Sequence, residues 1–398
     1  MKRLVVCCDG TWNRPDTDHV TNVEMIARTV ETDPGAGDPP AQQSVLYLTG
    51  VGTHGYILDR WLGGAFGFGL SENVLAGYRW LALNYDPGDD IFVFGFSRGA
   101  YTARSIVGMI GRVGLLTRQA LIEDHLPEAM RRYRRQRPQR RTSYGASDAR
   151  FREVHSHDDL RVRFLGVFDT VGALGVPGAL SRGHQFHDVN LSGTVLHARQ
   201  ALAIDEHRLT FEPSLWEAPS QPPDPDQTVK QVWFEGAHSD VGGGYADTGL
   251  SDTALAWMVR EAQAQGLRFD PELLRVYVGS GSAAIRHDSL TPAYRLLNRL
   301  SRLRLGLHPS SPGTRHFSGH ERVLGYEPGV AVSVATSARA HFRTDRDERD
   351  RWDGDRATAR DWYAPDNVGT YAKATNDLAD HAEEVVALPQ RPPAPTDD

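Results

Sequence analysis

The sequence predicts an α/β fold, a mostly parallel, doubly wound sheet with helices on both faces and an irregular C-terminal extension. Two observations support this fold class. First, several short β-rich runs are almost continuously apolar, as strands buried on both faces of a parallel sheet are. These runs are Leu4–Cys8, Ser44–Thr49, Asp90–Phe96, Arg161–Asp169 and Gln231–Glu235. Second, helical patterns lie between the runs, and alternating strand and helix is typical of α/β domains.

Apolar residues at helical spacing predict helices over Glu72–Asn84, Ala100–Ile110 and Leu121–Arg135. Another helix is expected to begin after Ser251 as its N-cap and to end before Gly266. Beyond about residue 280 the chain is rich in Pro, Gly, Arg and Asp. The expected organisation is a main domain over residues 1–280, with an insertion or lid at about 118–158. An irregular extension packed on the core (281–388) and a disordered tail (389–398) follow.

Composition limits the class of protein. The chain has 398 residues, and 44 Lys and Arg against 51 Asp and Glu give a net charge of −7, so no nucleic-acid partner is expected. The only cysteines, Cys7 and Cys8, are adjacent, which excludes a disulfide framework and fits a reducing compartment. The N-terminal apolar run stops at Asp9, too short for a signal peptide, and no segment is long enough to span a bilayer. We expect a cytoplasmic protein, with export by a route that needs no cleaved signal left open.

The segment most informative about chemistry is Gly95-Phe96-Ser97-Arg98-Gly99, a G-x-S-x-G pattern between an apolar strand and a helix. In an α/β-hydrolase-like fold this context makes a nucleophile elbow, a strained turn that lifts the serine oxygen above the sheet edge. Side chains at Gly95 and Gly99 would collide with the neighbouring strand and helix. The pattern predicts Ser97 as a catalytic nucleophile. The other interpretation is a tight strand–helix turn that merely needs small residues.

A catalytic serine needs a base and an orienting acid, which follow it in the order acid, then histidine, in this fold. Asp169 ends the next apolar run, and His238 lies in a glycine-rich loop after Gln231–Glu235. Asp240 is the alternative acid, although two residues of separation is short for reaching the far ring nitrogen. Two structural interpretations are also retained. In these, the Asp169 carboxylate caps a turn, and His238 is a loop residue hydrogen-bonded to the backbone. The fallback bases are His207, His320 and His341.

An oxyanion hole needs two backbone N–H donors. One is expected from Arg98, directly after the nucleophile. The other is expected from Gly10 or Thr11, after the first strand, unless Asp9-Gly10 is a plain turn. The Arg98 side chain either meets an anionic substrate or pairs with Asp9.

Ordered signatures along the chain resemble the uncharacterised α/β-hydrolase domain family that includes phospholipase effectors of bacterial type VI secretion. The signatures are 8–13 (CDGTWN), 50–53 (GVGT), 95–101 (GFSRGAY), 167–172 (VFDTVG), 197–206 (HARQALAIDE) and 233–245 (WFEGAHSDVGGGY). They cover roughly residues 2–280. The resemblance implies a Ser–Asp–His esterase, with Ser97, Asp169 and His238 at the motif positions, and acyl-ester or phospholipid substrates. It also implies a secretion or immunity partner.

An arginine-rich stretch, Arg131–Arg141, lies in the insertion, where lipases often carry a lid. It predicts either peripheral contact with anionic lipid headgroups or a solvated helix end that runs into a loop.

The sequence therefore predicts a serine hydrolase that cleaves carboxylic esters, with lipid or phospholipid acyl esters as the expected substrates and no cofactor. Two alternatives are retained. One is a non-catalytic binding or scaffold protein on a hydrolase fold. The other is a metal-dependent hydrolase that uses Asp9, His238 and Asp240, which lacks a clear third ligand at metal spacing.

Overall fold

The structure is a computed structural model. It describes residues 1–10, 19–32, 42–50, 64–135, 146–157, 159–171, 191–216, 224–277, 285–305, 322, 332–341 and 382–383. Within these residues no helix is both long and apolar enough to cross a membrane.

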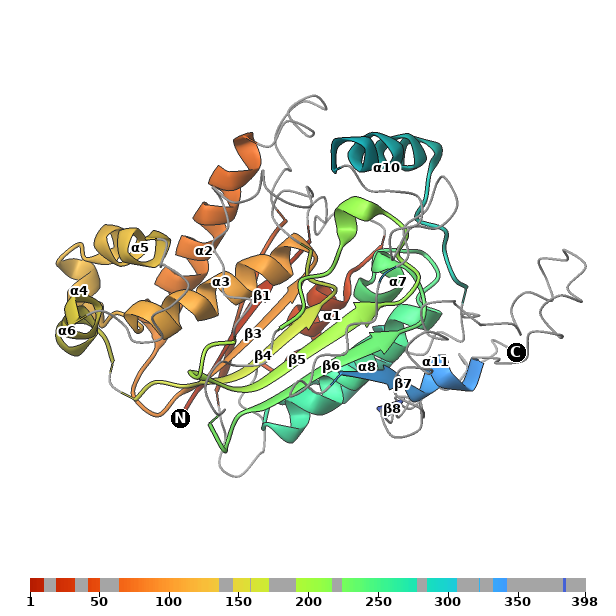
Figure 1. The fold of residues 1–398 in the computed structure, drawn as a ribbon. Helices are drawn as coiled ribbons and strands as arrows, with labels where there is room; N and C mark the ends of the chain where they lie inside the picture. Colours follow the sequence, from red (N-terminus) through yellow and green to blue (C-terminus); the bar gives the residue numbers. More distant parts are fainter. Residues whose placement is uncertain are drawn as a thin grey trace, which may run out of the picture.

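A single sheet of eight strands forms the centre of the described part of the chain, in the order β2-β1-β3-β4-β5-β6-β7-β8 (Figure 1). Every neighbouring pair is parallel, which confirms the predicted α/β class. The strands are β1 (Arg3–Cys8), β2 (Gln43–Leu48), β3 (Asp90–Phe96), β4 (Val162–Phe168), β5 (Val195–Ala203), β6 (Thr228–Phe234), β7 (Val332–Ala335) and β8 (Ala382–Glu383).

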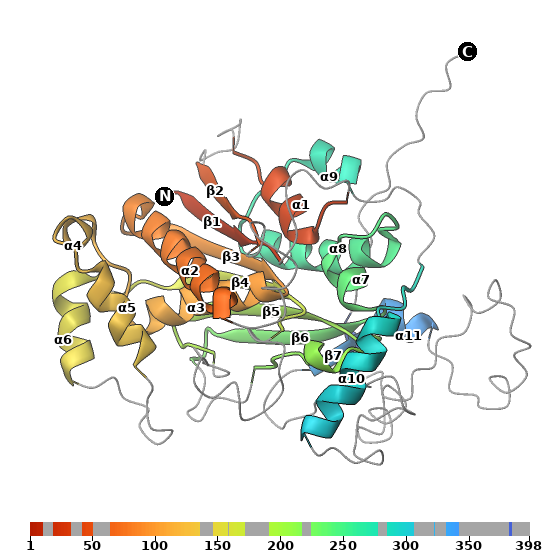
Figure 2. The same cartoon turned by 90° about the horizontal axis from the view of Figure 1, so that it is seen from above.

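Helices cover both faces of this sheet (Figure 2). They are α1 (Asn22–Thr29), α2 (Gly64–Asn84), α3 (Arg98–Val113), α4 (Arg118–Ile122), α5 (Leu126–Arg134), α6 (Ala146–His155), α7 (His238–Gly242), α8 (Gly249–Ala264), α9 (Pro271–Tyr277), α10 (Pro292–Leu305) and α11 (Thr336–His341), with a short 3-10 turn, η2 (Leu209–Phe211). Alternate residues of β1 enter two separate cores. Leu4 and Val6 pack with α2 and α3, whereas Val5 and Cys7 pack with α1 and α8.

Two helix predictions need correction. Leu121–Arg135 was expected as one helix, but α4 ends at Ile122 and α5 begins at Leu126, because Asp124 adopts a left-handed conformation (φ 59°) that ends the first helix. Ser251 was expected as an N-cap but lies inside α8, which begins at Gly249 after Thr248. The Ser251 hydroxyl instead donates to the Thr248 carbonyl at 3.1 Å.

Residues 281–388, expected to be an irregular extension, contribute regular structure. They supply α10, α11 and strands β7 and β8, and β7 pairs with β6 to extend the sheet. The expected tail (389–398) lies outside the described residues.

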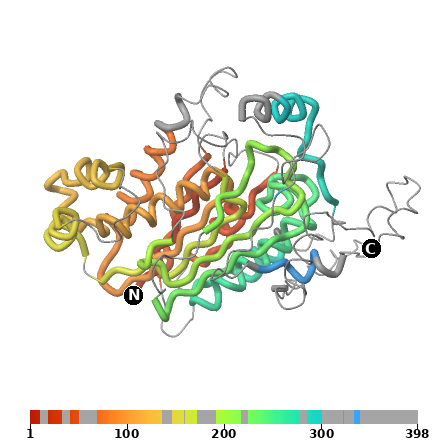
Figure 3. The backbone as a smooth tube through the Cα atoms, viewed as in Figure 1, coloured from red at the N-terminus to blue at the C-terminus, as the bar shows by residue number. Residues whose placement is uncertain are grey.

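The insertion at 118–158 forms α4, α5 and α6, which pack on the C-terminal half of α3. Arg112 donates to the Tyr133 carbonyl at 2.9 Å, and Arg152 donates to the Gly111 carbonyl at 2.8 Å. Figures 1 and 3 show these helices at the opposite end of the molecule from α7 and α10. The described part of the insertion therefore does not cover Ser97, which precedes the N-terminus of α3.

Candidate active site

Ser97 occupies the turn between β3 and α3 in a strained conformation, with φ 57° and ψ −122°. A non-glycine residue at positive φ costs free energy and persists only where the surroundings impose it, as at a nucleophile elbow. The Ser97 N–H donates to the Phe168 carbonyl at 3.0 Å, which ties the turn to the end of β4. Ser97 is 6% exposed.

The elbow glycines are required for the reason predicted. A Cβ at Gly99 would lie 2.1 Å from the Cys8 carbonyl oxygen, so α3 approaches the end of β1 too closely for any side chain. A Cβ at Gly95 would lie 2.6 Å from the Ala100 Cα. Both contacts are with backbone, which cannot move aside without shifting an element.

Replacing Gly99 by alanine is expected to lower the free energy of unfolding by about 1–3 kcal/mol or more, because overpacking against fixed backbone displaces α3 from β1. Urea denaturation of wild type and Gly99→Ala measures this loss. Gly193→Ala is the matched control, because a Cβ there meets nothing within 4 Å. Equal stability of Gly99→Ala and Gly193→Ala would contradict the close approach of α3 to β1.

Asp169 follows β4 directly and is completely buried, with φ 40°. Its Oδ1 accepts from the Ala203 N–H at 3.0 Å, and its Oδ2 lies 2.5 Å from His238 Nδ1. A carboxylate only accepts hydrogen bonds, so the Nδ1 of His238 carries the proton and Nε2 keeps its lone pair. This is the tautomer that a general base needs.

His238 is the first residue of α7, where the chain leaves β6 and turns into a short helix. Its ring packs against the Phe96 ring at 4.6 Å and the Phe211 ring at 5.0 Å, which places it beside the residue that precedes Ser97. Burial lowers the pKa of His238 and outweighs the bond to Asp169, which raises it. The imidazole is therefore held in its neutral, proton-accepting form.

A residue that the sequence analysis missed completes the buried cluster. The guanidinium of Arg322 is fully buried and donates to both carboxylate oxygens of Asp169, at 2.6 and 2.9 Å. It also donates to the carbonyls of Ala203, at 2.8 Å, and Phe211. No sequence pattern marks Arg322, because it lies 153 positions from Asp169.

The electrostatics of Asp169 follow from this pairing. Burial alone raises the pKa of Asp169, but the charge of Arg322 and the hydrogen bond from His238 outweigh it, so the pKa lies well below its usual range. Asp169 is therefore ionised, and Arg322 supplies the charge that makes a buried carboxylate tolerable.

Asp240, the alternative acid, is engaged elsewhere. Its Oδ2 accepts from the Ala237 N–H at 2.9 Å, and its Oδ1 lies 2.6 Å from His287 Nδ1. Asp240 sits in the first turn of α7, and its carboxylate folds back onto that N-terminus rather than reaching the His238 ring. The structure thus pairs His238 with Asp169.

The residues expected to form the oxyanion hole differ in whether their N–H groups already have a partner. Arg98 is the first residue of α3, where the N–H groups point out of the helix N-terminus. The Gly10 N–H already donates to Asp9 Oδ1 at 2.6 Å, and Thr11 lies outside the described residues. Burial lowers the pKa of the Arg98 side chain to about 10.

Asp9 is anchored by hydroxyl groups. Its Oδ2 accepts from Thr21 at 2.7 Å and from Tyr47 at 2.5 Å. Among the described residues Asp9, His238 and Asp240 do not form a metal-ligating cluster, which argues against the metal-dependent alternative. Of the fallback bases, His207 precedes η2, His341 ends α11, and His320 lies outside the described residues.

Helix α10 packs beside the candidate site through the segment that contains Phe211. Its Asn298 accepts from the Leu209 N–H and donates to the His207 carbonyl, both at 3.0 Å. The Tyr294 ring lies 6.0 Å from the Phe211 ring, which in turn contacts His238. The guanidinium of Arg208, which donates two hydrogen bonds to Glu206, stacks over Phe211 at 3.5 Å.

The chain is similar to several known proteins. A family model described as the catalytic domain of Tle1-like phospholipase effectors of the type VI secretion system matches residues 2–261. An uncharacterized protein of Saccharomyces cerevisiae is 29% identical over 229 residues, which cover 53% of this chain and 32% of that protein.

Two solved structures also align. An uncharacterized protein from Pseudomonas aeruginosa is 18% identical with a TM-score of 0.41, over 77% of this chain and 51% of that one. The Tle1 effector bound to the VgrG spike is 20% identical with a TM-score of 0.35, over 62% and 52%. The chain thus spans about half the length of these solved relatives and about a third of the yeast protein. Because the family model covers well over half of the chain, the protein belongs to the Tle1-like phospholipase effectors of the type VI secretion system, through their catalytic domain.

Proposed function

We propose that this protein is a serine hydrolase that cleaves the acyl esters of phospholipids through an acyl-enzyme. The observation that carries the proposal is the buried Asp169–His238 pair, 2.5 Å apart, beside the strained turn that presents Ser97. Membership of a phospholipase effector family supports a lipid substrate.

The chemistry follows from the positions of the groups. The Ser97 oxygen attacks the acyl carbonyl carbon as its proton passes to His238 Nε2. Asp169 stabilises the imidazolium that results, and His238 then gives the proton to the departing alcohol, which leaves as a lysophospholipid. Water, deprotonated by the same imidazole, hydrolyses the acyl-enzyme and releases a fatty acid.

The negative charge that develops on the carbonyl oxygen needs donors that are fixed in advance. In this proposal the Arg98 N–H is one donor, supported by the dipole of α3, whose N-terminus lies directly behind Ser97. The second donor comes from the segment after β1. Thr11 is preferred there over Gly10, whose N–H is bound by Asp9.

The proposed partners follow from the family and the charge pattern. A component of the type VI secretion machinery and a neutralising immunity protein are the partners expected for an effector of this family. Arg132 in the arginine-rich stretch is engaged by Glu128 and Asp148, at 2.6 and 3.0 Å. The proposed contact with anionic lipid therefore depends on the other arginines of Arg131–Arg141, of which Arg131, Arg134 and Arg135 are exposed.

The proposal is tested by incubating the purified protein with phospholipid vesicles and with nitrophenyl esters of graded chain length. The expected products from vesicles are a free fatty acid and a lysophospholipid, identified by mass spectrometry. Release of a phosphorylated headgroup with intact diacylglycerol would instead indicate phosphodiester cleavage. No turnover of any ester would favour the non-catalytic binding protein.

A further inference from the structure

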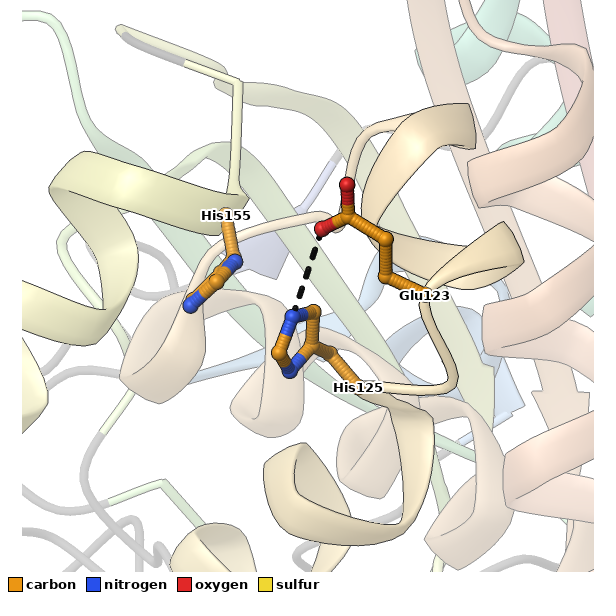
Figure 4. A group of neighbouring side chains, drawn as sticks. All are labelled: Glu123, His125 and His155. Atoms are coloured by element: carbon orange, nitrogen blue, oxygen red, sulfur yellow. Dashed lines mark ion pairs between the residues drawn. The ribbon is translucent and has the colours of Figure 1, made fainter.

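Three metal-ligating side chains meet at the end of the molecule away from the candidate active site. They are Glu123 and His125, from the turn between α4 and α5, and His155, the last residue of α6 (Figure 4). One ligand atom from each lies within 4.8 Å of the other two. Within the described parts of the chain it is the one group of three or more His, Cys, Asp or Glu side chains close enough to share a metal ion. Nothing in the proposed esterase mechanism uses it.

The backbone conformation of two separate segments positions the members of this cluster. Asp124, at φ 59°, makes the sharp turn that brings Glu123 and His125 to the same side, with Glu123 Oε2 3.4 Å from His125 Nε2. The backbone at His155 and Ser156 is held by hydrogen bonding to the segment that precedes α4. The His155 carbonyl accepts from the Thr117 N–H at 2.9 Å, and Leu116 and Ser156 form an antiparallel bridge.

We propose that Glu123, His125 and His155 bind a divalent transition metal ion, zinc(II) by preference. Two imidazoles and one carboxylate form a ligand set that suits zinc, with water in the fourth position. Zinc–ligand bonds of about 2.0–2.1 Å in a tetrahedron place ligand atoms about 3.3 Å apart. The Glu123–His125 separation of 3.4 Å already matches. The His155 ligand atom lies within 4.8 Å of the other two, so the proposal requires its side chain to move closer when the ion binds.

The surroundings of the cluster support a metal site. Gln119 donates to Glu123 Oε1 at 2.8 Å, which orients the carboxylate and leaves Oε2 directed at His125, as partners of metal-ligating carboxylates do. The Phe151 ring lies 4.9 Å from the His155 ring and forms an apolar wall. The nearby cation, Arg132, is balanced by Glu128 and Asp148.

The consequence would be structural. The ion joins the start of α5 to the end of α6, so it closes the open end of the hairpin whose connecting segment contains the rest of the arginine-rich stretch. It would hold the insertion together independently of Ser97 chemistry. No sequence pattern marks this site, because His155 lies 30 or more positions from Glu123 and His125 and meets them only through folding.

The experiment uses the 398-residue protein, stripped with a chelator and titrated with zinc(II) and with cobalt(II). One equivalent is expected to bind, cobalt(II) to give the intense visible absorption of tetrahedral coordination, and zinc(II) to raise the Tm. His155→Gln and His125→Gln are expected to weaken binding more than about 100-fold, and Gln119→Ala by roughly 10–100-fold. His197→Gln, a histidine on β5 that is bonded to Thr228, is the control and is expected to bind as wild type.

The outcomes separate a metal site from a plain ion pair. Cobalt(II) binding that persists in both His155→Gln and His125→Gln, or the absence of a tetrahedral spectrum in wild type, would overturn the proposal. Circular dichroism of the metal-free variants tests their folding, and ester hydrolysis by these variants is expected to stay at the wild-type rate. Because binding is measured directly, failure here leaves the proposed esterase untouched.

Discussion

Replacing Ser97 by alanine is expected to reduce kcat for ester hydrolysis by a factor of about 10⁴–10⁶, because the acyl-enzyme cannot form without the serine oxygen. The fold is expected to survive, since the change removes one oxygen atom and leaves the Ser97 N–H to bond Phe168. Steady-state kinetics of the two proteins on one nitrophenyl ester measures the loss. A fluorophosphonate probe is expected to label wild type once, at Ser97, and to leave Ser97→Ala unlabelled.

Ser105→Ala provides the matched control, because Ser105 is a buried serine farther along α3. It is expected to keep wild-type kinetics and labelling. Wild-type activity in Ser97→Ala would refute the nucleophile assignment. Loss of activity in both variants would point to damage to α3 rather than to the chemistry at Ser97.

Replacing Arg322 by methionine is expected to lower kcat about 100-fold, since Asp169 loses the two bonds that fix its carboxylate and His238 is held less precisely. Breaking a buried pair also costs about 3–5 kcal/mol of stability, which urea denaturation measures. Arg322 is a positioning residue in this account, acting on His238 through Asp169.

The dependence of kcat/KM on pH distinguishes positioning from general stability. The base must be neutral, and burial holds the pKa of His238 below its ordinary value, so wild-type activity is lost only as the pH falls below the ordinary histidine range. Without Arg322 the negative charge of Asp169 is no longer balanced by the guanidinium and acts on His238 alone. The pKa of His238 then rises, and the acid limb moves to higher pH.

Arg322→Lys separates charge from geometry. Lysine keeps the positive charge but cannot form the two-pronged contact, so its acid limb is expected near that of wild type while kcat falls. An acid limb that does not move in a folded Arg322→Met protein would show that Arg322 serves stability alone. Equal kcat in Arg322→Lys and wild type would show that charge, rather than geometry, is what Asp169 requires.

The strands that carry apolar side chains on both faces were predictable from the sequence. Runs such as Leu4–Cys8 and Asp90–Phe96 coincide closely with β1 and β3, because their side chains enter the two cores alternately. Strand β5 was missed for the opposite reason. Its Arg199 and Gln200 are buried polar residues, and Arg199 pairs with Glu261 on α8, so no apolar run marks the strand.

The same contrast holds for the candidate site. By itself the sequence determined the elbow around Ser97 and the order in which Asp169 and His238 follow it at the ends of later strands. These features depend on local backbone geometry and on the rule that parallel strands end at one edge. Only the tertiary structure decided that His238 pairs with Asp169 rather than Asp240, that Arg322 closes on Asp169, and that His155 meets Glu123 and His125. The physical reason is distance along the chain, because contacts between remote segments depend on how helices pack and leave no periodicity or spacing in the sequence.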